Sequence, residues 1–114
     1  MTDCIFCKIV AGEIPATIVY RDDQATAFRD LGPKAPVHVL VVPNRHIAGM
    51  DDLQEGDADL IGRLVLAASQ VARVEGLAES GYRLVFNSGP DAGQSVFHIH
   101  LHLLGGRRLA WPPG

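Results

Sequence analysis

The sequence predicts an α+β fold with an antiparallel sheet of about five strands, one long helix and one short helix. The chain has 114 residues, of which 47% are hydrophobic and 20% charged, the size and composition of one globular domain. Only one segment has a long helical period, and the other apolar runs are short and rich in β-branched residues. No repeat or linker divides the chain, so we expect residues 1–114 to form a single domain.

The N-terminal part predicts a short helix followed by a hairpin. Residues 4–11 place apolar side chains at helical spacing, and Gly12 follows, which is typical of a two-turn helix that ends at a glycine. Two β-branched runs, residues 17–21 and 25–29, are separated by three polar residues. This pattern predicts two antiparallel strands joined by a tight turn.

A loop and an apolar strand are predicted next. Residues 30–36 contain two prolines and one glycine, so regular strand pairing is excluded there. Residues 37–42 are apolar except for His38, and Pro43 follows them. Such a run is typical of a strand that is buried on both faces.

The second half predicts one long helix and two further strands. From residue 57 to residue 72 the apolar residues recur at intervals of three and four, and Gly76 follows the last turn. Residues 82–86 and 97–104 have the pattern of strands, and residues 87–94 form a turn between them. The order of elements predicts a sheet with the helices packed against one face.

Charge and hydropathy exclude several classes of function. The chain has 10 Lys and Arg against 13 Asp and Glu, whereas a protein that wraps long nucleic acid needs a basic surface. The first residues contain no basic segment, and no apolar run approaches the roughly 20 residues that span a bilayer. We therefore expect a cytoplasmic protein that binds neither a membrane nor long nucleic acid. The charge of the chain is compatible with a small charged ligand.

Three of the five histidines alternate with apolar residues. In a regular strand His98, His100 and His102 would share one face, and the apolar residues from Phe97 to Leu103 would face the core. Solvent-facing strand positions normally carry Thr, Lys, Glu or Ser, so a chance arrangement is improbable. A single metal site is one interpretation, although the outer two Cα atoms are about 13 Å apart. The other is a nucleophile in the middle, with flanking imidazoles that orient it and hold the substrate.

The segment before the histidines contains small residues that suit a phosphate. The backbone N–H groups between Gly89 and Gly93, with Gln94 and Ser95 after them, would surround phosphate oxygens. The segment lacks the Lys-Ser or Lys-Thr ending of a P-loop, and a plain turn has the same composition.

The two cysteines, Cys4 and Cys7, are expected in a reducing compartment, where a structural disulfide is unfavourable. No strand precedes them, so a thioredoxin-like redox site is disfavoured. A zinc site would need two more ligands, which histidines would supply. Plain thiols remain the alternative.

Residues 94–104 resemble the motif of the histidine triad (HIT) superfamily, in which three histidines alternate with apolar residues. Residues 30–43, residues 4–15 and the ending Trp-Pro-Pro-Gly are similar to the Hint branch, the histidine triad nucleotide-binding proteins. The resemblance implies a homodimer whose two sheets join. It also implies hydrolysis of the P–N bond of purine nucleoside phosphoramidates, through a nucleotidyl-histidine intermediate.

The resemblance implies roles for individual residues. His100 is the expected nucleophile, with His102 near the phosphate and His38 bonded toward His100. Ser95 is expected beside the leaving nitrogen, which it helps to protonate, and Asp30 is expected to accept the ribose hydroxyls. The phosphate is expected to contact Asn87, Gly93 and Gln94. The base pocket is expected to be lined by Ile5, Phe6, Ile14, Phe28 and Leu31.

Some relatives with this motif hold a structural zinc ion, which closes the N-terminal helix onto the sheet. The matching ligands in this sequence are Cys4, Cys7, His46 and His98. The chemistry itself would require no cofactor. Other Hint proteins lack both the cysteines and the metal.

The sequence leaves three other functions open. They are a dinucleoside polyphosphate hydrolase, a nucleotide-binding scaffold protein with incidental hydrolysis, and a metal-dependent oxygenase or cupin-like site. The scaffold is not excluded by any feature of the sequence, whereas an oxygenase would lose its activity to a chelator. Arg107 and Arg108 are expected to be solvated, with a contact to an acidic leaving group across the dimer as the alternative.

Overall fold

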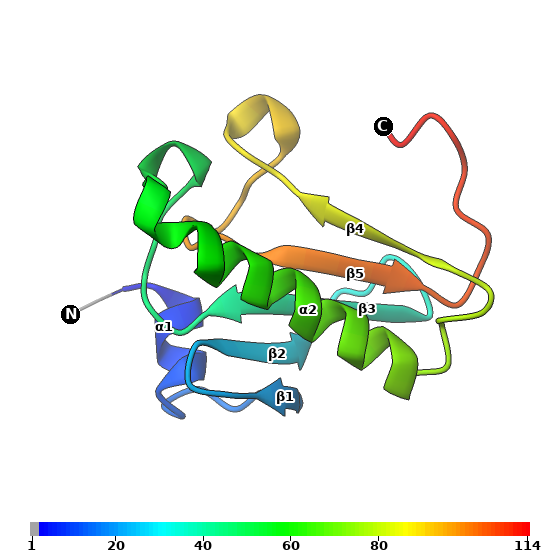
Figure 1. Ribbon diagram of the computed structural model, residues 1–114, viewed down its shortest axis with the longest axis horizontal. Coiled ribbons are helices and arrows are strands. Elements are labelled where there is room, and N and C mark those ends of the chain that lie inside the picture. Colours follow the sequence, from blue (N-terminus) through cyan, green and yellow to red (C-terminus); the bar gives the residue numbers. More distant parts are fainter. Residues whose placement is uncertain (1–2) are drawn as a thin grey trace.

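The structure is a computed structural model that describes residues 3–114. Five strands form one antiparallel sheet in the order β1-β2-β3-β5-β4 (Figure 1). The strands are β1 (Ile18–Arg21), β2 (Ala25–Arg29), β3 (Val37–Pro43), β4 (Tyr82–Phe86) and β5 (Leu101–Gly105). The helices are α1 (Ile5–Val10) and α2 (Ala58–Val74), and short 3₁₀ turns occupy Met50–Asp52, Glu55–Asp57 and Pro90–Ala92. The predicted α+β fold is confirmed, and each predicted helix and strand is present.

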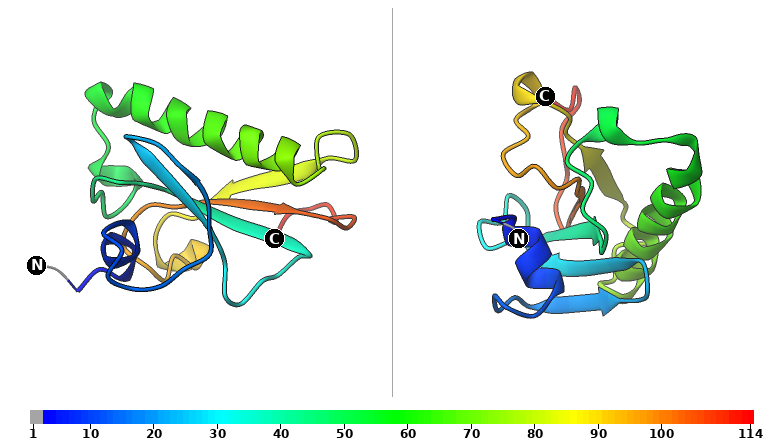
Figure 2. Two further views of the ribbon diagram at one scale, coloured as in Figure 1. Left: turned by 90° about the horizontal axis from the view of Figure 1, so that it is seen from below. Right: turned by 90° about the vertical axis from the view of Figure 1, so that its left-hand side faces the viewer.

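The two helices cover opposite faces of the sheet (Figure 2). The large cluster of buried side chains under α2 includes Ala27, Val39 and Leu103 of the sheet. The smaller cluster under α1 includes Phe28 and Leu40. These two residues directly follow Ala27 and Val39 along their strands, so their side chains point to the other face. The prediction that both helices pack against one face is therefore wrong. The apolar run of β3 is the feature that indicated the correct arrangement, because a strand covered on both faces needs apolar residues at every position.

Helix α2 buries one stripe of its surface. Six residues spaced at three and four face the sheet: Leu60, Leu64, Ala67, Ala68, Val71 and Ala72. The helix ends before Gly76, whose φ of +79° is the left-handed conformation that glycine adopts without steric cost. Among residues 3–114 no helix is long and apolar enough to cross a membrane.

The last strand is shorter than predicted, and this difference shapes the site. The sequence pattern predicts a strand over residues 97–104, but β5 begins at Leu101. The backbone N–H of Ile99 donates to the carbonyl of Ile47 in the loop after β3, at 2.8 Å, rather than to a neighbouring strand. Phe97 is 60% exposed instead of facing the core, and the His98 ring is fully buried. The three histidines therefore do not share one face, and His98 separates from the other two.

Candidate active site

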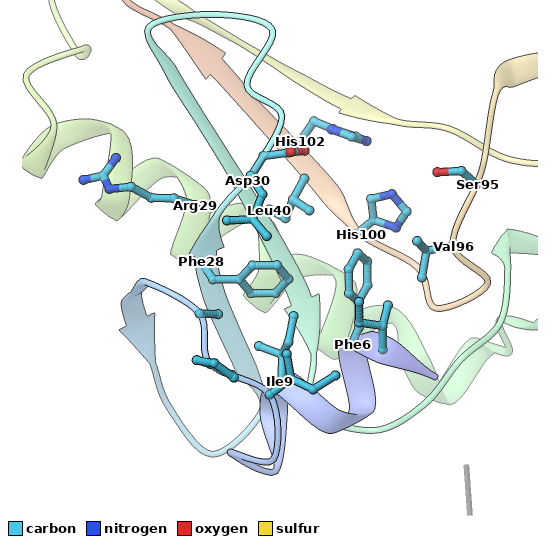
Figure 3. A pocket seen from close by; sticks show the side chains of 15 residues that line it. Phe6, Ile9, Phe28, Arg29, Asp30, Leu40, Ser95, Val96, His100 and His102 are labelled. Atoms are coloured by element: carbon cyan, nitrogen blue, oxygen red, sulfur yellow. The ribbon is translucent and has the colours of Figure 1, made fainter. Parts of the chain in front are cut away.

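A pocket of about 280 Å³ lies between α1, the start of the β2–β3 loop and the irregular segment before β5 (Figure 3). His100, His102, Asp30 and Ser95 line it on the polar side. All five apolar residues predicted for a base pocket line it as well: Ile5, Phe6, Ile14, Phe28 and Leu31. Six further lining residues were not predicted: Ile9, Pro15, Ala16, Arg29, Leu40 and Val96. Two of them had a signal in the sequence, because Ile9 lies one helical turn after Ile5 and Leu40 alternates with His38.

The buried ring of His100 has its tautomer fixed by the backbone. Its Nδ1 lies 2.8 Å from the carbonyl oxygen of His98. A carbonyl only accepts, so Nδ1 carries the proton and the Nε2 of the neutral ring keeps its lone pair. The rings of Phe6 and His100 pack edge to face, with centroids 5.1 Å apart. The result is an oriented imidazole with an unprotonated nitrogen available for attack.

His38 and His102 form a hydrogen-bonded pair with a defined direction. The backbone N–H of Lys34 donates to Nδ1 of His38 at 3.0 Å, so the proton of the neutral His38 ring is on Nε2. That Nε2 lies 2.9 Å from Nδ1 of His102 and donates to it, which leaves the second proton on Nε2 of His102. The expectation that His38 bonds toward His100 is therefore wrong, because its partner is His102.

The Nε2–H of His102 is a buried donor without a partner. This nitrogen is the one buried side-chain nitrogen or oxygen in residues 3–114 for which no hydrogen bond is found. A buried donor is more stable with an acceptor than without one, so a ligand oxygen that accepts from it would be stabilised. His102 lies on β5 beside His100, with ring centroids 4.9 Å apart. An anionic oxygen bound next to His100 would be the natural acceptor.

Burial keeps both rings of the pair neutral. Burial, together with the neighbouring His100 and His38 rings, lowers the pKa of His102 to about 4. Burial also lowers the pKa of His38, and the Asp30 carboxylate offsets this shift only in part. The Asp30 Oδ2 atom lies 3.5 Å from His38 Nε2. At neutral pH the pair is therefore uncharged, and its protons are ordered by hydrogen bonds.

Asp30, His38 and His102 also bring three potential metal ligands within 4.8 Å of one another. A metal on Nε2 of His38 would need the ring proton on Nδ1, where the Lys34 amide already donates. Both nitrogens of His38 would then be unprotonated. The hydrogen bonds therefore favour a proton relay over a metal centre, which disfavours the oxygenase interpretation.

A second polar cluster lies on the other side of His98. Its donor atoms come from Cys4, Cys7, His46 and His98, and all lie within 4.8 Å of one another. The Nδ1 atom of His98 is 3.3 Å from Cys4 Sγ and 3.2 Å from Nδ1 of His46. Cys7 Sγ is 3.3 Å from the same His46 nitrogen. Tetrahedral zinc with bonds of about 2.3 Å to sulfur and 2.0 Å to nitrogen separates its ligand atoms by roughly 3.3–3.8 Å.

The chemistry of the donor set fits zinc as well as the distances do. Nε2 of His98 donates to the carbonyl of Pro43 at 2.8 Å, which leaves the lone pair of Nδ1 directed at the cluster. Burial and the neighbouring Cys4 raise the pKa of the Cys7 thiol, so thiolates would need a nearby cation. Cys4 is also the N-cap of α1, because its Sγ accepts a hydrogen bond from the N–H of Cys7 at 3.3 Å. The cluster therefore connects α1 with the segment before β5.

Of the polar residues predicted near the phosphate, some line the pocket and others do not. Ser95 lies at the pocket, on the segment that faces His100 (Figure 3). Gln94 is buried, and its side chain bonds to the backbone: Oε1 accepts from Gly89 N–H, and Nε2 donates to the carbonyls of Ala48 and Val96. Among residues 3–114, the lining of this pocket does not include Asn87, Gly93 or Gln94. The Gln94 side chain therefore stabilises the conformation of the loop that begins at Gly89. Of the four residues, only Ser95 lines the pocket.

Both residues of the arginine pair are exposed, as expected for solvated side chains, and Arg107 also makes hydrogen bonds. Its guanidinium donates to the carbonyls of Arg108 and Lys34, at 3.0 and 2.9 Å. The side chain is exposed but hydrogen-bonded, and it connects the C-terminal segment with the β2–β3 loop.

The sequence matches one family model and several known proteins. The model described as HIT domain matches residues 11–109. A HIT-like protein of Synechococcus elongatus is 54% identical over 112 residues, covering 98% of this chain and 97% of that protein. A 14 kDa zinc-binding protein of Brassica juncea is 50% identical over 114 residues, covering 98% of this chain and all 100% of that protein.

Two further matches have names that state an activity. An adenylylsulfatase of Arabidopsis thaliana is 50% identical over 112 residues, covering 96% of this chain and 76% of that protein. The crystal structure of a HIT family hydrolase from Legionella pneumophila is similar with a TM-score of 0.96 and 53% identity. That match covers 98% of this chain and 100% of the other.

Proposed function

The chain belongs to the HIT domain family, and from this premise we propose that it is a nucleotide hydrolase that cleaves the P–N bond of purine nucleoside 5′-phosphoramidates. The observation that carries the proposal is the pairing of two imidazole rings at one pocket, with centroids 4.9 Å apart. Nε2 of His100 has a lone pair because Nδ1 donates to the His98 carbonyl. Nε2 of His102 has a proton and no partner. A nucleophile beside a donor that can bind an anionic oxygen is the arrangement that attack on a phosphorus atom requires.

The reaction has two steps. Nε2 of His100 attacks phosphorus and forms an N–P bond while the P–N bond of the substrate breaks, and the amine departs with a proton from the Ser95 hydroxyl or from water that it positions. Water then attacks phosphorus in the nucleotidyl-His100 intermediate and gives its proton back to the Ser95 oxygen, or to the hydroxide left from the water, while the N–P bond breaks, which releases the nucleoside monophosphate and restores the imidazole. The His102 N–H donates to a phosphate oxygen in both steps, and His38 holds the His102 tautomer.

The nucleoside is held by the rest of the pocket. The rings of Phe6 and Phe28 contact each other edge to face at 5.4 Å and provide an apolar wall for a purine. Asp30 stands at the edge of the pocket and accepts a ribose hydroxyl, although its Oδ1 already accepts from the N–H of Gly32 at 2.7 Å. We also propose that the backbone of the loop at Asn87 and Gly93 contacts the phosphate, although these residues do not line the pocket.

We also propose that Cys4, Cys7, His46 and His98 hold one structural zinc ion. The distances within the cluster and the orientation of His98 support this assignment. The Brassica juncea relative is named for zinc binding. The ion would supply the positive charge that stabilises two thiolates and would fix α1 against the segment before β5. No step of the reaction passes through it.

The assembly and location are part of the same proposal. Strand β4 is an edge of the sheet, and we propose that residues 1–114 form one domain that pairs with a second copy into a continuous sheet. Light scattering is expected to give the mass of a dimer. Two thiol ligands are best retained in a reducing compartment, so we place the protein in the cytoplasm.

A second substrate is favoured by one comparison. Adenylyl sulfate, which the name of the Arabidopsis thaliana relative indicates, has an adenylyl group on a different leaving group. Attack by His100 on its phosphorus atom would give the same adenylyl-His100 intermediate and release sulfate. No feature of the structure comparably favours a dinucleoside polyphosphate or a purely scaffolding role.

The test is an intact-mass spectrum after rapid acid-free quenching with adenosine 5′-phosphoramidate. We expect a fraction of the chain to gain the mass of one adenylyl group, with the adduct mapped to His100. Turnover without an adduct, or an adduct on a different residue, would overturn the assignment of the nucleophile. The same experiment with adenylyl sulfate shows which substrate forms the adenylyl-His100 intermediate faster.

A further inference from the structure

The turn that follows β5 is connected to the histidine pair by a chain of three hydrogen bonds. The Arg107 guanidinium donates to the backbone carbonyl of Lys34 at 2.9 Å. The backbone N–H of Lys34 donates to Nδ1 of His38 at 3.0 Å. Nε2 of His38 lies 2.9 Å from Nδ1 of His102. A surface residue of the C-terminal segment is thus connected to the pocket through the backbone of one residue.

The contact between this turn and the β2–β3 loop is close as well as polar. Gly106 has a φ of +91°, and a Cβ atom added there would lie 2.9 Å from Cβ of Pro36. Real Cβ atoms essentially never approach so closely, so the turn rests directly on the loop only because residue 106 is glycine. The Lys34 side chain adds a third constraint, because Nζ donates to the carbonyl of Gly32 at 2.6 Å. The loop is therefore held on both sides of the Lys34 amide.

We propose that the turn at Gly106 and Arg107 sets the direction of the His38–His102 relay, by holding the Lys34 amide against Nδ1 of His38. Arg107 is then a positioning residue that touches no substrate. The catalytic consequence rests on the function proposed above, whereas the proton arrangement is a property of the protein without a ligand.

The direction matters because a neutral imidazole has one N–H group and one lone pair. While the Lys34 amide occupies Nδ1 of His38, the protons are on Nε2 of both rings, and His102 presents a donor to the pocket. Without this amide the opposite arrangement becomes available, with protons on Nδ1 of both rings. His102 would then present a lone pair to the pocket. A lone pair repels the phosphate oxygen that a donor would bind, so the reversed pair loses its ability to stabilise the transition state.

Nitrogen-15 NMR of the ring nitrogens tests the proposal without any substrate, since protonated and unprotonated ring nitrogens differ widely in chemical shift. In the unchanged protein at neutral pH we expect Nδ1 of His38 to be unprotonated and Nε2 of His38 and His102 to be protonated. Arg107→Ala should move the His38 signals toward the other tautomer. It should also lower kcat roughly two- to ten-fold with little change in KM, the effect of weakening one hydrogen bond. Arg107→Lys, which keeps one donor, should restore part of both changes.

Arg108→Ala is the matched control. Arg108 is the neighbouring arginine, and its backbone carbonyl rather than its side chain takes part in the contact. We expect this variant to have the spectrum and the kinetics of the unchanged protein. Unchanged His38 signals in Arg107→Ala would overturn the proposal even if kcat fell, because a general loss of stability does not predict a tautomer shift.

A second pair of variants acts directly on the amide. Lys34→Pro removes the N–H, whereas Lys34→Ala removes the side chain and keeps the N–H. We expect the full tautomer shift in Lys34→Pro and at most a small one in Lys34→Ala, which loses only the contact of Nζ with Gly32. If Lys34→Pro does not fold, the Arg107 variants decide the question. A protein that hydrolyses no phosphoramidate but shows these tautomers would contradict the proposed function and leave this inference standing.

Discussion

Nδ1 of His100 lies 2.8 Å from the carbonyl oxygen of His98, and the ring of that same His98 lies in the Cys–His cluster. One residue therefore serves both polar sites: its backbone orients the proposed nucleophile, and its side chain belongs to the Cys–His cluster. Its Nε2 donates to the Pro43 carbonyl, so the ring is held at both nitrogens. The position of the His98 carbonyl depends on that fixed ring. The Cys–His cluster and the candidate active site are thus adjacent and share one segment of the chain.

The first prediction concerns the metal. Elemental analysis of fully reduced protein is expected to give one zinc ion per chain. Cys7→Ser should lose the ion, and its free energy of unfolding should fall by about 3 kcal/mol when zinc is present at roughly 100 times its Kd. The control is the same comparison in excess chelator, where the two proteins should differ far less. Absence of metal from reduced protein would contradict the assignment.

Brief chelation should leave most of the activity, because no step of the reaction uses the ion.

The second prediction concerns the nucleophile. His100→Ala should lower kcat for adenosine 5′-phosphoramidate by at least about 10³-fold, because the covalent route is lost. Binding of adenosine monophosphate, measured by calorimetry, should remain within about ten-fold of the original. The proposed base and ribose contacts come from other residues that line the pocket, such as Phe6, Phe28 and Asp30. Turnover that persists in this variant would assign the nucleophile to another group.

Local patterns in the sequence predict most of the fold. The helical period of residues 57–72 and the β-branched runs decide secondary structure within short windows, and each corresponding element is present. The faces of the sheet were harder to predict, because which face a short helix covers depends on long-range packing. The apolar run of β3 contained that information, since Leu40 faces α1 while Val39 faces α2.

The site shows where sequence patterns stop being sufficient. Alternation predicts that His98, His100 and His102 share a face, but the strand does not begin until Leu101. The burial of the His98 ring and its bond to Pro43 outweigh the strand pattern locally. The contact between His38 and His102 spans 64 residues and arises from the pairing of β3 with β5, which no local pattern encodes. The role of the Lys34 amide cannot be inferred from residue type, because every residue except proline has that group.

The third prediction separates the two candidate substrates by their leaving groups. An amine must gain a proton as the P–N bond breaks, whereas sulfate departs as a stable anion. Ser95→Ala should therefore lower kcat/KM for adenosine 5′-phosphoramidate by about 10²-fold, the lower range of general acid catalysis. The effect on adenylyl sulfate should be several-fold at most. Ser88→Ala, in the loop after β4 and outside the pocket lining, is the control. Equal losses for both substrates would show that Ser95 acts on binding and not on the leaving nitrogen.

The fourth prediction concerns the pH dependence of stability. Burial and the neighbouring His100 and His38 rings lower the pKa of His102 from its ordinary 6.5 to about 4. Lys34 also disfavours the charged ring, and Asp30 is the one nearby group that favours it. Between these two pH values the unfolded chain binds a proton that the native ring does not. The free energy of unfolding should therefore fall as the pH decreases from about 6.5 to about 4, and this contribution should level off below that range.

His102→Gln isolates this contribution. Glutamine keeps polar atoms at the position and does not titrate, and the other four histidines are present in both proteins. Urea unfolding at pH 7 and pH 4.5, both with saturating zinc, should show a smaller loss of stability in the variant. The difference should be about 1–3 kcal/mol, since the ring is only partly buried and solvent screens part of the shift. An identical pH dependence in the two proteins would mean that His102 is protonated in the folded state as readily as in the unfolded chain. The uncharged relay would then exist only above about pH 6.5, and below that pH the anion would be held by a charged imidazolium instead.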